Sequence, residues 1–203
     1  MLALTSVGVG AAVYLLVQPA GMIFGLSMAT AYAGLLLLAI SLLLGPWNVL
    51  RTRPNPTSTD LRRDVGIWAG ILSLAHVFFG LQVHMRGRFW TYFVFGAEER
   101  FGGLPRFDLF GLANYTGLAA TLVLAGLLAL SNDRSLRRLG TQRWKGLQRW
   151  NYAAFVLVAV HGAAYQWMET RVPLFVGGFG LLVLLVVALQ VVGFRRVHAG
   201  GGG

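Results

Sequence analysis

The feature that most constrains this chain is the grouping of its apolar residues into six long blocks. Most of them approach the roughly 20 residues that cross the hydrocarbon of a bilayer as a helix. The blocks cover residues 2–17, 22–44, 64–84, 110–130, 150–168 and 172–193. The composition agrees, because 56% of the residues are hydrophobic and only 12% are charged, about half of the usual globular share. These blocks predict an all-α membrane protein built as a bundle of six transmembrane helices.

The lysines and arginines between the blocks fall unevenly on the two faces of such a bundle. The face with both termini and the loops 45–63 and 131–149 carries twelve of them, namely Arg51, Arg53, Arg62, Arg63, Arg134, Arg137, Arg138, Arg143, Lys145, Arg149, Arg195 and Arg196. The other face carries five, namely Arg86, Arg88, Arg100, Arg106 and Arg171. The positive-inside rule therefore predicts that both termini are cytoplasmic. The net charge of +10 is then explained by basic residues that set the orientation of the chain and contact anionic membrane lipid. Nucleic-acid binding is not expected.

Little of the chain remains outside the six spans. We expect a single transmembrane domain over residues 1–199, with the four glycines at 200–203 as a linker or an expression remnant. The largest external segment is the loop 85–109, whose aromatic residues are expected at the membrane interface or in a lid over a site in the bundle. The chain has no cysteine, which excludes disulfides, thiolate metal sites and covalent haem attachment.

Two histidines stand out because they lie deep inside predicted spans. His76 lies 12 residues after Asp64 and His161 lies 11 residues after Trp150. Both spans run from the cytoplasm outward, so the two imidazoles are expected at nearly the same depth. A buried imidazole needs a partner, which could be a hydrogen bond to another helix or an axial position on haem iron. Zinc would require further ligands, and no cysteine or mid-span carboxylate exists. Haem is favoured, while His198 in the C-terminal tail has no expected role.

Two longer motifs surround these histidines. The segment RRDVGIWAGILSLAH resembles the RRxLGLxxFxxxxLH motif of the ferric reductase-like transmembrane family. The segment LRRLGTQRWKGLQRWNYAAFVLVAVH similarly resembles that family's LRRLGxxWxxLHRLxYxxxxxxxxH motif. The resemblance is closest to the haem-binding membrane subunits of bacterial periplasmic methionine sulfoxide reductase systems. It implies a six-helix bundle that carries electrons through b-type haem from a cytoplasmic donor to an acceptor outside.

Carried over by position, His76 and His161 match the ligands of the family's outer haem. The inner ligand positions fall on Arg62 and Gln148, and neither side chain is an ordinary iron ligand. We therefore expect one haem b per chain. Arg62 and Arg63 at the cytoplasmic edge could pair with haem propionates or an anionic cofactor, and ordinary membrane anchoring is the interpretation preferred for Arg63.

Two roles are considered for His84. A second haem held by His84 and Met168 would lie only about 10–12 Å along the helices from the first, which leaves little room for two macrocycles. We therefore expect His84 at the outer mouth, near a propionate, an acceptor or water.

These expectations combine into one functional hypothesis with two rivals. The hypothesis is the electron-transfer subunit of an oxidoreductase system in a bacterial inner membrane, supplied by a flavin reductase or a quinol, with flavin or quinone as a further cofactor. One rival is a haem-free transporter or proton-relay protein that uses the buried histidines, although the spans lack the buried acidic partners such relays usually need. The other rival is an assembly or anchoring subunit without a redox role.

Overall fold

The computed structural model describes residues 2–17, 21–51, 58–85, 88–169 and 171–199. The glycines at 200–203 that we expected to be a linker lie outside these described residues. The helices are α1 (Leu2–Val17), α2 (Met22–Leu50), α3 (Ser58–Val83), the short 3-10 helix η1 (Phe89–Tyr92), α4 (Leu109–Leu130), α5 (Asp133–Gln148), α6 (Trp150–Met168) and α7 (Pro173–Ala199). Each of the six predicted spans is one helix, which confirms the all-α membrane bundle.

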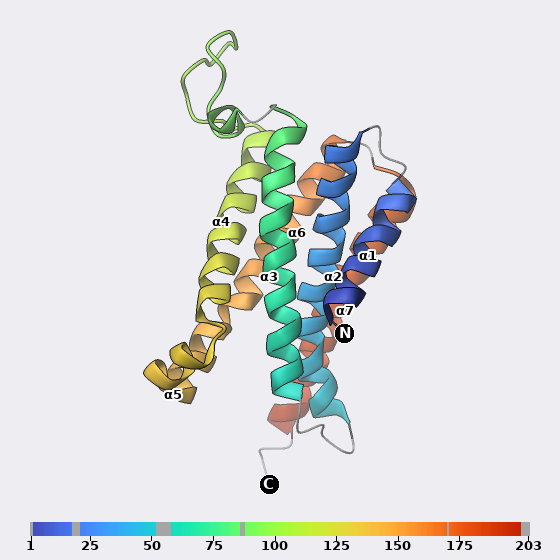
Figure 1. The fold of residues 1–203 in the computed structure, drawn as a ribbon, viewed down its shortest axis with the longest axis vertical. Helices are drawn as coiled ribbons and strands as arrows, with labels where there is room; N and C mark the ends of the chain where they lie inside the picture. The colour runs from blue at the N-terminus through green and yellow to red at the C-terminus, as the bar shows by residue number, and fades with distance from the viewer. Residues whose placement is uncertain (1, 18–20, 52–57, 86–87, 170, 200–203) are drawn as a thin grey trace.

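The six spans differ in how clearly they qualify as membrane helices. Four of them, α2, α3, α4 and α7, are long and apolar enough to cross a bilayer by length and composition. Helix α1 has only 16 residues, and its apolar stretch is Val7–Leu16. Helix α6 has 19 residues and runs diagonally through the same thickness as its neighbours (Figure 1). Helix α2 extends to Leu50 with Pro46 inside it, beyond the end that its apolar block predicted.

The segment 131–149, expected only as a cytoplasmic loop, contains the polar helix α5. The Asn132 side chain caps it by accepting a hydrogen bond from the Ser135 N–H at 2.9 Å, the usual role of Asn at this position. The helix bends at Gly140, which has a φ of 72°. Trp144 holds the second half of α5 against the bundle, because its indole Nε1 donates to the Leu130 carbonyl at 2.9 Å.

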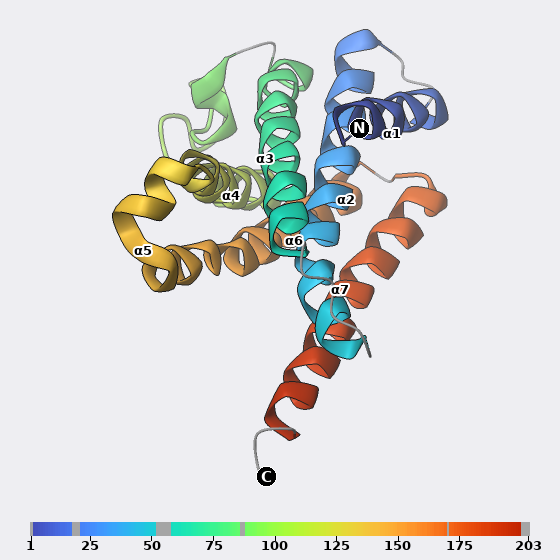
Figure 2. The ribbon, with the colours of Figure 1, turned by 60° about the horizontal axis from the view of Figure 1, so that its bottom comes forward.

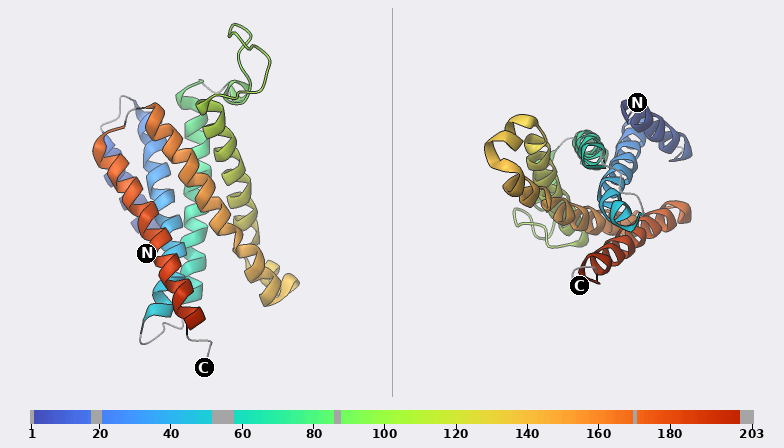
Figure 3. Two further views of the ribbon diagram at one scale, coloured as in Figure 1. Left: turned by 180° about the vertical axis from the view of Figure 1, so that it is seen from behind. Right: turned by 90° about the horizontal axis from the view of Figure 1, so that it is seen from below.

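Helix α2 is the centre of the bundle, packing against α1, α3 and α7 and touching α6. Helices α4 and α6 form a second closely packed pair. Figures 2 and 3 show α4 on the side of α3 away from α1, while α6 crosses the bundle obliquely from α5 toward α2 and the start of α7. One end of the bundle carries residues 88–108, and the opposite end carries α5 and the end of α7 (Figure 1). We call these the outer end and the inner end.

Small side chains allow the helices to approach closely, as is usual in membrane bundles. Ala39 of α2, Ala69 of α3 and Ala154 of α6 are fully buried and belong to one apolar core with Leu42 of α2. Polar side chains add connections between helices. Asn151 donates to the Ser41 hydroxyl at 3.1 Å, and the Gln190 amide donates to the Leu42 carbonyl at 2.7 Å.

Residues 88–108 fold into a compact outer segment above α3 and α4 (Figure 1). Arg106 is buried at its centre and forms ion pairs with Glu99 at 2.6 Å and with Asp108 at 2.8 Å. Tyr92 of η1 is also buried, and its hydroxyl donates to the Gly80 and Leu81 carbonyls at the end of α3. The segment is therefore attached to the bundle by specific hydrogen bonds, in addition to any contact with the membrane interface.

Candidate functional site

The candidate site is built around His76 of α3 and His161 of α6, which face each other across the bundle. Their ring centres are 6.1 Å apart and their planes are inclined by 74°. The equal depth predicted for them thus brings the two side chains together. A metal–nitrogen bond of about 2 Å on each side, plus about 1 Å from each nitrogen to its ring centre, would separate the centres by about 6 Å. The spacing suits two imidazoles on opposite sides of one metal ion.

Both imidazoles are held through Nδ1. The Nδ1 of His76 lies 2.9 Å from the Ser27 carbonyl oxygen of α2, and the Nδ1 of His161 lies 2.8 Å from the Ala113 carbonyl oxygen of α4. A carbonyl only accepts, so Nδ1 carries the proton and Nε2 keeps a free lone pair. No hydrogen bond to either Nε2 occurs within the described part of the chain. A ring tethered in this way is the usual state of a metal-binding histidine.

One glycine gives the His161 ring the room that it occupies. A Cβ at Gly117 of α4 would lie 2.6 Å from the Nδ1 of His161, whereas a Cβ at Gly80 of α3 would make only an ordinary contact, 3.6 Å from the Cε1 of His76. Gly117 therefore has to be a glycine for His161 to reach the Ala113 carbonyl. Gly70 and Gly162 serve packing instead, since they lie against Leu128 and Phe179.

The two histidines line the outer cavity, which is formed by α2, α3, α4 and α6 and extends to the outer end. Its wall around the histidines is mainly apolar, with Leu35, Leu118, Leu124 and Val158 among the lining residues. An apolar shell of this kind suits haem, whose properties depend on burial and on the axial ligands. The cavity measures about 210 Å³, less than the roughly 300–1,000 Å³ of common ligand sites. A macrocycle can therefore enter only if lining side chains turn outward.

The donor set also fits haem better than a bare metal ion. Among the described residues, no group of three or more His, Cys, Asp or Glu side chains is placed to hold a metal. Haem needs only axial ligands from the protein, because the macrocycle supplies the other four nitrogens. Two opposed imidazoles with free Nε2 atoms are sufficient for that purpose.

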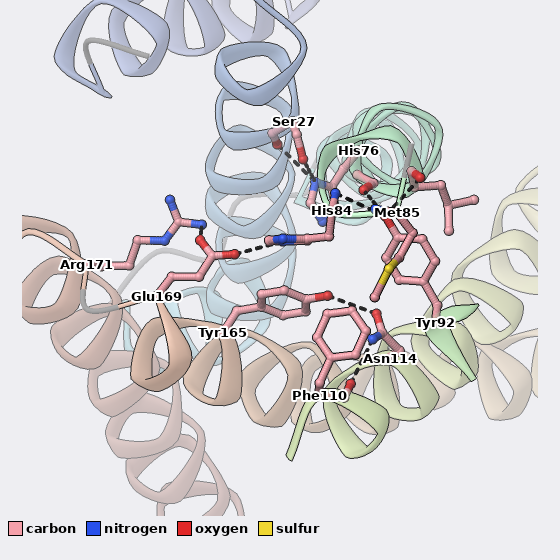
Figure 4. Close-up of polar contacts among 12 residues, drawn as sticks. Ser27, His76, His84, Met85, Tyr92, Phe110, Asn114, Tyr165, Glu169 and Arg171 are labelled. Atoms are coloured by element: carbon pink, nitrogen blue, oxygen red, sulfur yellow. Dashed lines mark hydrogen bonds and ion pairs between the residues drawn. The ribbon is translucent and has the colours of Figure 1, made fainter. Parts of the chain in front are cut away.

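His84 lies at the outer end of the same cavity (Figure 4). Its Nε2 is 2.9 Å from the Glu169 Oε1, and the Glu169 Oε2 pairs with Arg171. Its partner there is Glu169, and Met168, the other ligand of the second haem site considered above, is not among the lining residues given for the described chain. The spans alone offered no acidic partner for the histidines because Glu169 lies one residue past the end of α6.

Tyr165 connects the two histidine regions. Its ring lies 4.9 Å from the His161 ring and stacks on His84 at 5.7 Å. The Tyr165 hydroxyl donates to the Asn114 Oδ1 at 2.9 Å. The position of Tyr165 four residues after His161 places both on one helix face, so the spacing alone could have indicated this contact.

Arg62 and Gln148 both line a second cavity at the inner end, which we call the inner cavity. It measures about 430 Å³. Its lining includes four cationic side chains, Arg62, Arg63, Lys145 and Arg149, and no Asp or Glu from the described part of the chain. The Gln148 amide nitrogen is 3.4 Å from the Ser131 hydroxyl. Arg62 and Gln148, which occupy the inner ligand positions suggested by the family resemblance, thus line the same cavity. Neither side chain is a good iron ligand.

Two other basic residues have simpler surroundings. Arg63 pairs with Asp133 at the start of α5 at 2.9 Å, which links α3 to the inner-end helix and agrees with an anchoring role. His198 is exposed near the end of α7, and its Nδ1 contacts the Phe194 carbonyl one turn earlier at 2.9 Å. His198 is not among the lining residues of either cavity.

Comparison with known proteins gives one match. The family described as "Ferric reductase like transmembrane component" matches residues 30–159, which is 130 of the 203 residues. The matched segment contains His76, His84, Arg62 and Gln148 and ends two residues before His161. No curated protein and no solved structure matches the chain significantly.

Proposed function

We propose that this chain, which belongs to the ferric reductase like transmembrane component family, is a b-type membrane cytochrome. Membership of the family assigns it a role in membrane electron transfer. In our proposal, electrons pass from a donor on the inner, cytoplasmic side through one haem to an acceptor on the outer side. The observation that carries the proposal is the pair of opposed imidazoles of His76 and His161, each tethered at Nδ1 and free at Nε2.

The residues around the two histidines support the proposed binding of haem. His76 and His161 would hold the haem iron from two helices, and the carbonyls of Ser27 and Ala113 would fix the rings and increase their basicity. Haem, when bound, supplies an iron that changes its charge by one electron. The mainly apolar wall around the histidines would bury the haem, and two axial imidazoles would leave its iron no open position for ligand exchange.

The inner cavity supports a donor on the cytoplasmic side. Its four cationic side chains without a lining carboxylate would attract an anionic group such as a flavin phosphate. Its Asn151 and Gln148 amides would also suit the carbonyl oxygens of a flavin or a quinone. We accordingly propose a flavin reductase or a membrane quinol as the electron source, with Arg62 and Gln148 lining the place where it delivers electrons.

The location and partners follow from the same observations. The chain is an integral membrane protein in contact with lipid, and we propose the bacterial inner membrane as its location. The basic residues at the inner end then face the cytoplasm and the anionic lipid of that leaflet. The outer segment, residues 88–108, would face the redox acceptor.

A haem-free proton relay is the second candidate, because one specific observation favours it. The contact of His84 with Glu169 supplies a buried acidic partner that such relays usually need. A relay does not require the rings of His76 and His161 to lie close together, whereas one haem held by both does. Their spacing of 6.1 Å between ring centres is the reason that we prefer the cytochrome.

An absorbance spectrum of the purified protein separates these candidates. A bis-histidine cytochrome should be red, with a Soret band that shifts and sharp visible bands that appear on reduction with dithionite. The spectrum should be the same in detergent and in lipid vesicles. A protein that is folded and colourless after expression with ample haem would contradict the cytochrome and favour the relay or an assembly role.

A further inference from the structure

A charged cluster lies at the outer end of the outer cavity. It consists of His84, Glu169 and Arg171, joined by the contact of His84 with Glu169 and by the ion pair of Glu169 with Arg171. The side chains are 32%, 19% and 14% exposed, respectively. They come from the end of α3 and from the turn between α6 and α7 (Figure 4). The cluster is thus largely buried, and His84 is its most exposed member.

The other ionisable groups around His84 are fixed in their own hydrogen bonds. The Tyr165 hydroxyl donates to Asn114, and the Tyr92 hydroxyl donates to the Gly80 and Leu81 carbonyls. From α4, His84 meets the edge of the uncharged Phe110 ring. Arg106 lies over that ring and is already paired with two carboxylates. From α2, Tyr32 lies near Glu169 and Arg171, and its ring packs against Phe175. Among the described residues, the contact of His84 with Glu169 is the one place in this group where an imidazole and a carboxylate meet.

Both members of this pair have a free position for a proton. The Nδ1 of His84 makes no hydrogen bond within the described part of the chain. The Glu169 Oε1 is buried and receives no aligned hydrogen bond, although the His84 Nε2 is 2.9 Å away. Histidine is the side chain whose charge ordinarily changes between about pH 5 and 8.

The cluster is also close enough to sense a charge at the histidine pair. His84 follows His76 by eight residues on α3, which is about 12 Å along the helix. Tyr165 fills the space between His161 and His84, so little solvent screens that path. A charge added in such a low-dielectric interior changes the proton affinity of a neighbour far more than it would in water.

We propose that the His84–Glu169 pair takes up a proton from the outer side when the site between His76 and His161 gains an electron. This inference rests on the proposed function. One electron arrives from the donor, which is oxidised. One proton moves from water on the outer side to His84 or Glu169, and no other bond is formed or broken. When the electron leaves for the acceptor, the proton returns to outer water. Arg171 keeps the resting pair close to neutral overall charge, so that the proton balances the added electron.

The test measures the midpoint potential of the purified, haem-loaded protein at several pH values between about 5.5 and 8.5. The slope of potential against pH gives the number of protons taken up per electron. We expect an uptake of about half a proton per electron over part of this range, because two charges about 12 Å apart interact only moderately at an effective dielectric constant of about 20. His84→Gln and Glu169→Gln should each reduce the uptake severalfold, and His198→Gln, which changes an exposed histidine that lines neither cavity, should leave it unchanged.

The outcomes separate this inference from the proposed function. A protein without a Soret band would overturn the cytochrome itself. A normal Soret band with a potential that does not depend on pH in the unchanged chain would overturn only the proton uptake. The same would follow if both glutamine variants kept the full slope, because another group would then bind the proton. If one variant does not fold, the other variant and the unchanged chain still decide the question.

Discussion

At the scale of single residues, the site depends on backbone atoms and on a missing side chain as much as on the histidines. His76 and His161 could be identified from the sequence because helix geometry converts their positions into equal depths. The carbonyls of Ser27 and Ala113, which fix the two rings, could not be identified from the sequence. Every residue has a carbonyl, and only the packing of α2 and α4 brings these two to the histidines. Gly117 matters for the same reason, because its position opposite His161 depends on how α4 meets α6.

Gly117→Ala should disturb the His161 ring directly. The new methyl group would lie 2.6 Å from Nδ1, so the ring has to turn away from the Ala113 carbonyl. We expect a stability loss of about 1–3 kcal/mol, typical of overpacking, together with lower haem content. Gly126→Ala is the matched control, because it lies on the same helix with nothing within 4 Å of a new Cβ. Equal thermal stability and equal haem content of the two variants would refute the role given to Gly117.

At the scale of elements, the apolar blocks predicted the six long helices well, and the polar connections poorly. A block of about 20 apolar residues in a bilayer has to form a helix to satisfy its backbone, so α4 and α6 begin and end close to the predicted positions. Helix α5 has no such requirement. It forms because Asn132 caps it and Trp144 reaches the Leu130 carbonyl, and the second contact depends on tertiary structure. Glu169 was missed similarly, since only the folded bundle brings it to His84.

The bend in α5 should depend on Gly140. Its φ of 72° lies in the left-handed region, where a residue with a Cβ loses about 1–2 kcal/mol. Gly140→Ala should therefore lower the melting temperature of the purified protein in detergent. Gly146→Ala in the same helix has a helical backbone and open space for a Cβ, so it should be neutral or stabilising by up to about 1 kcal/mol. A Gly140 variant as stable as the Gly146 variant would mean that the bend is not required.

At the scale of the whole molecule, the two cavities lie one above the other along the bundle, with the histidine pair toward the outer end and the cationic side chains at the inner end. This order matches electron flow from a cytoplasmic donor to an outer acceptor. The direction of this electron flow depends on which end of the bundle faces the cytoplasm. The basic residues predict that it is the inner end, where α5 and the end of α7 lie (Figure 1).

Cysteine labelling tests this orientation in a chain that has no cysteine of its own. Glu98→Cys places a thiol on the outer segment, and Thr141→Cys places one on α5, both at exposed positions. In right-side-out vesicles, a membrane-impermeant maleimide should label the first and spare the second. Inverted vesicles should give the opposite pattern. Labelling of both thiols in sealed vesicles of one orientation would contradict the arrangement of the spans.

The central claim is that His76 and His161 together hold one haem, and haem content per chain tests it most directly. A pyridine haemochrome assay on purified protein should give about one haem b per chain, since covalent attachment is excluded by the lack of cysteine. His76→Ala and His161→Ala should each remove most of the haem while the protein still inserts in the membrane, and His198→Ala should retain it. A ratio near two would contradict the single site, because Arg62 and Gln148 or His84 would then have to contribute to a second one. Full haem retention in both His76→Ala and His161→Ala would contradict the account as a whole.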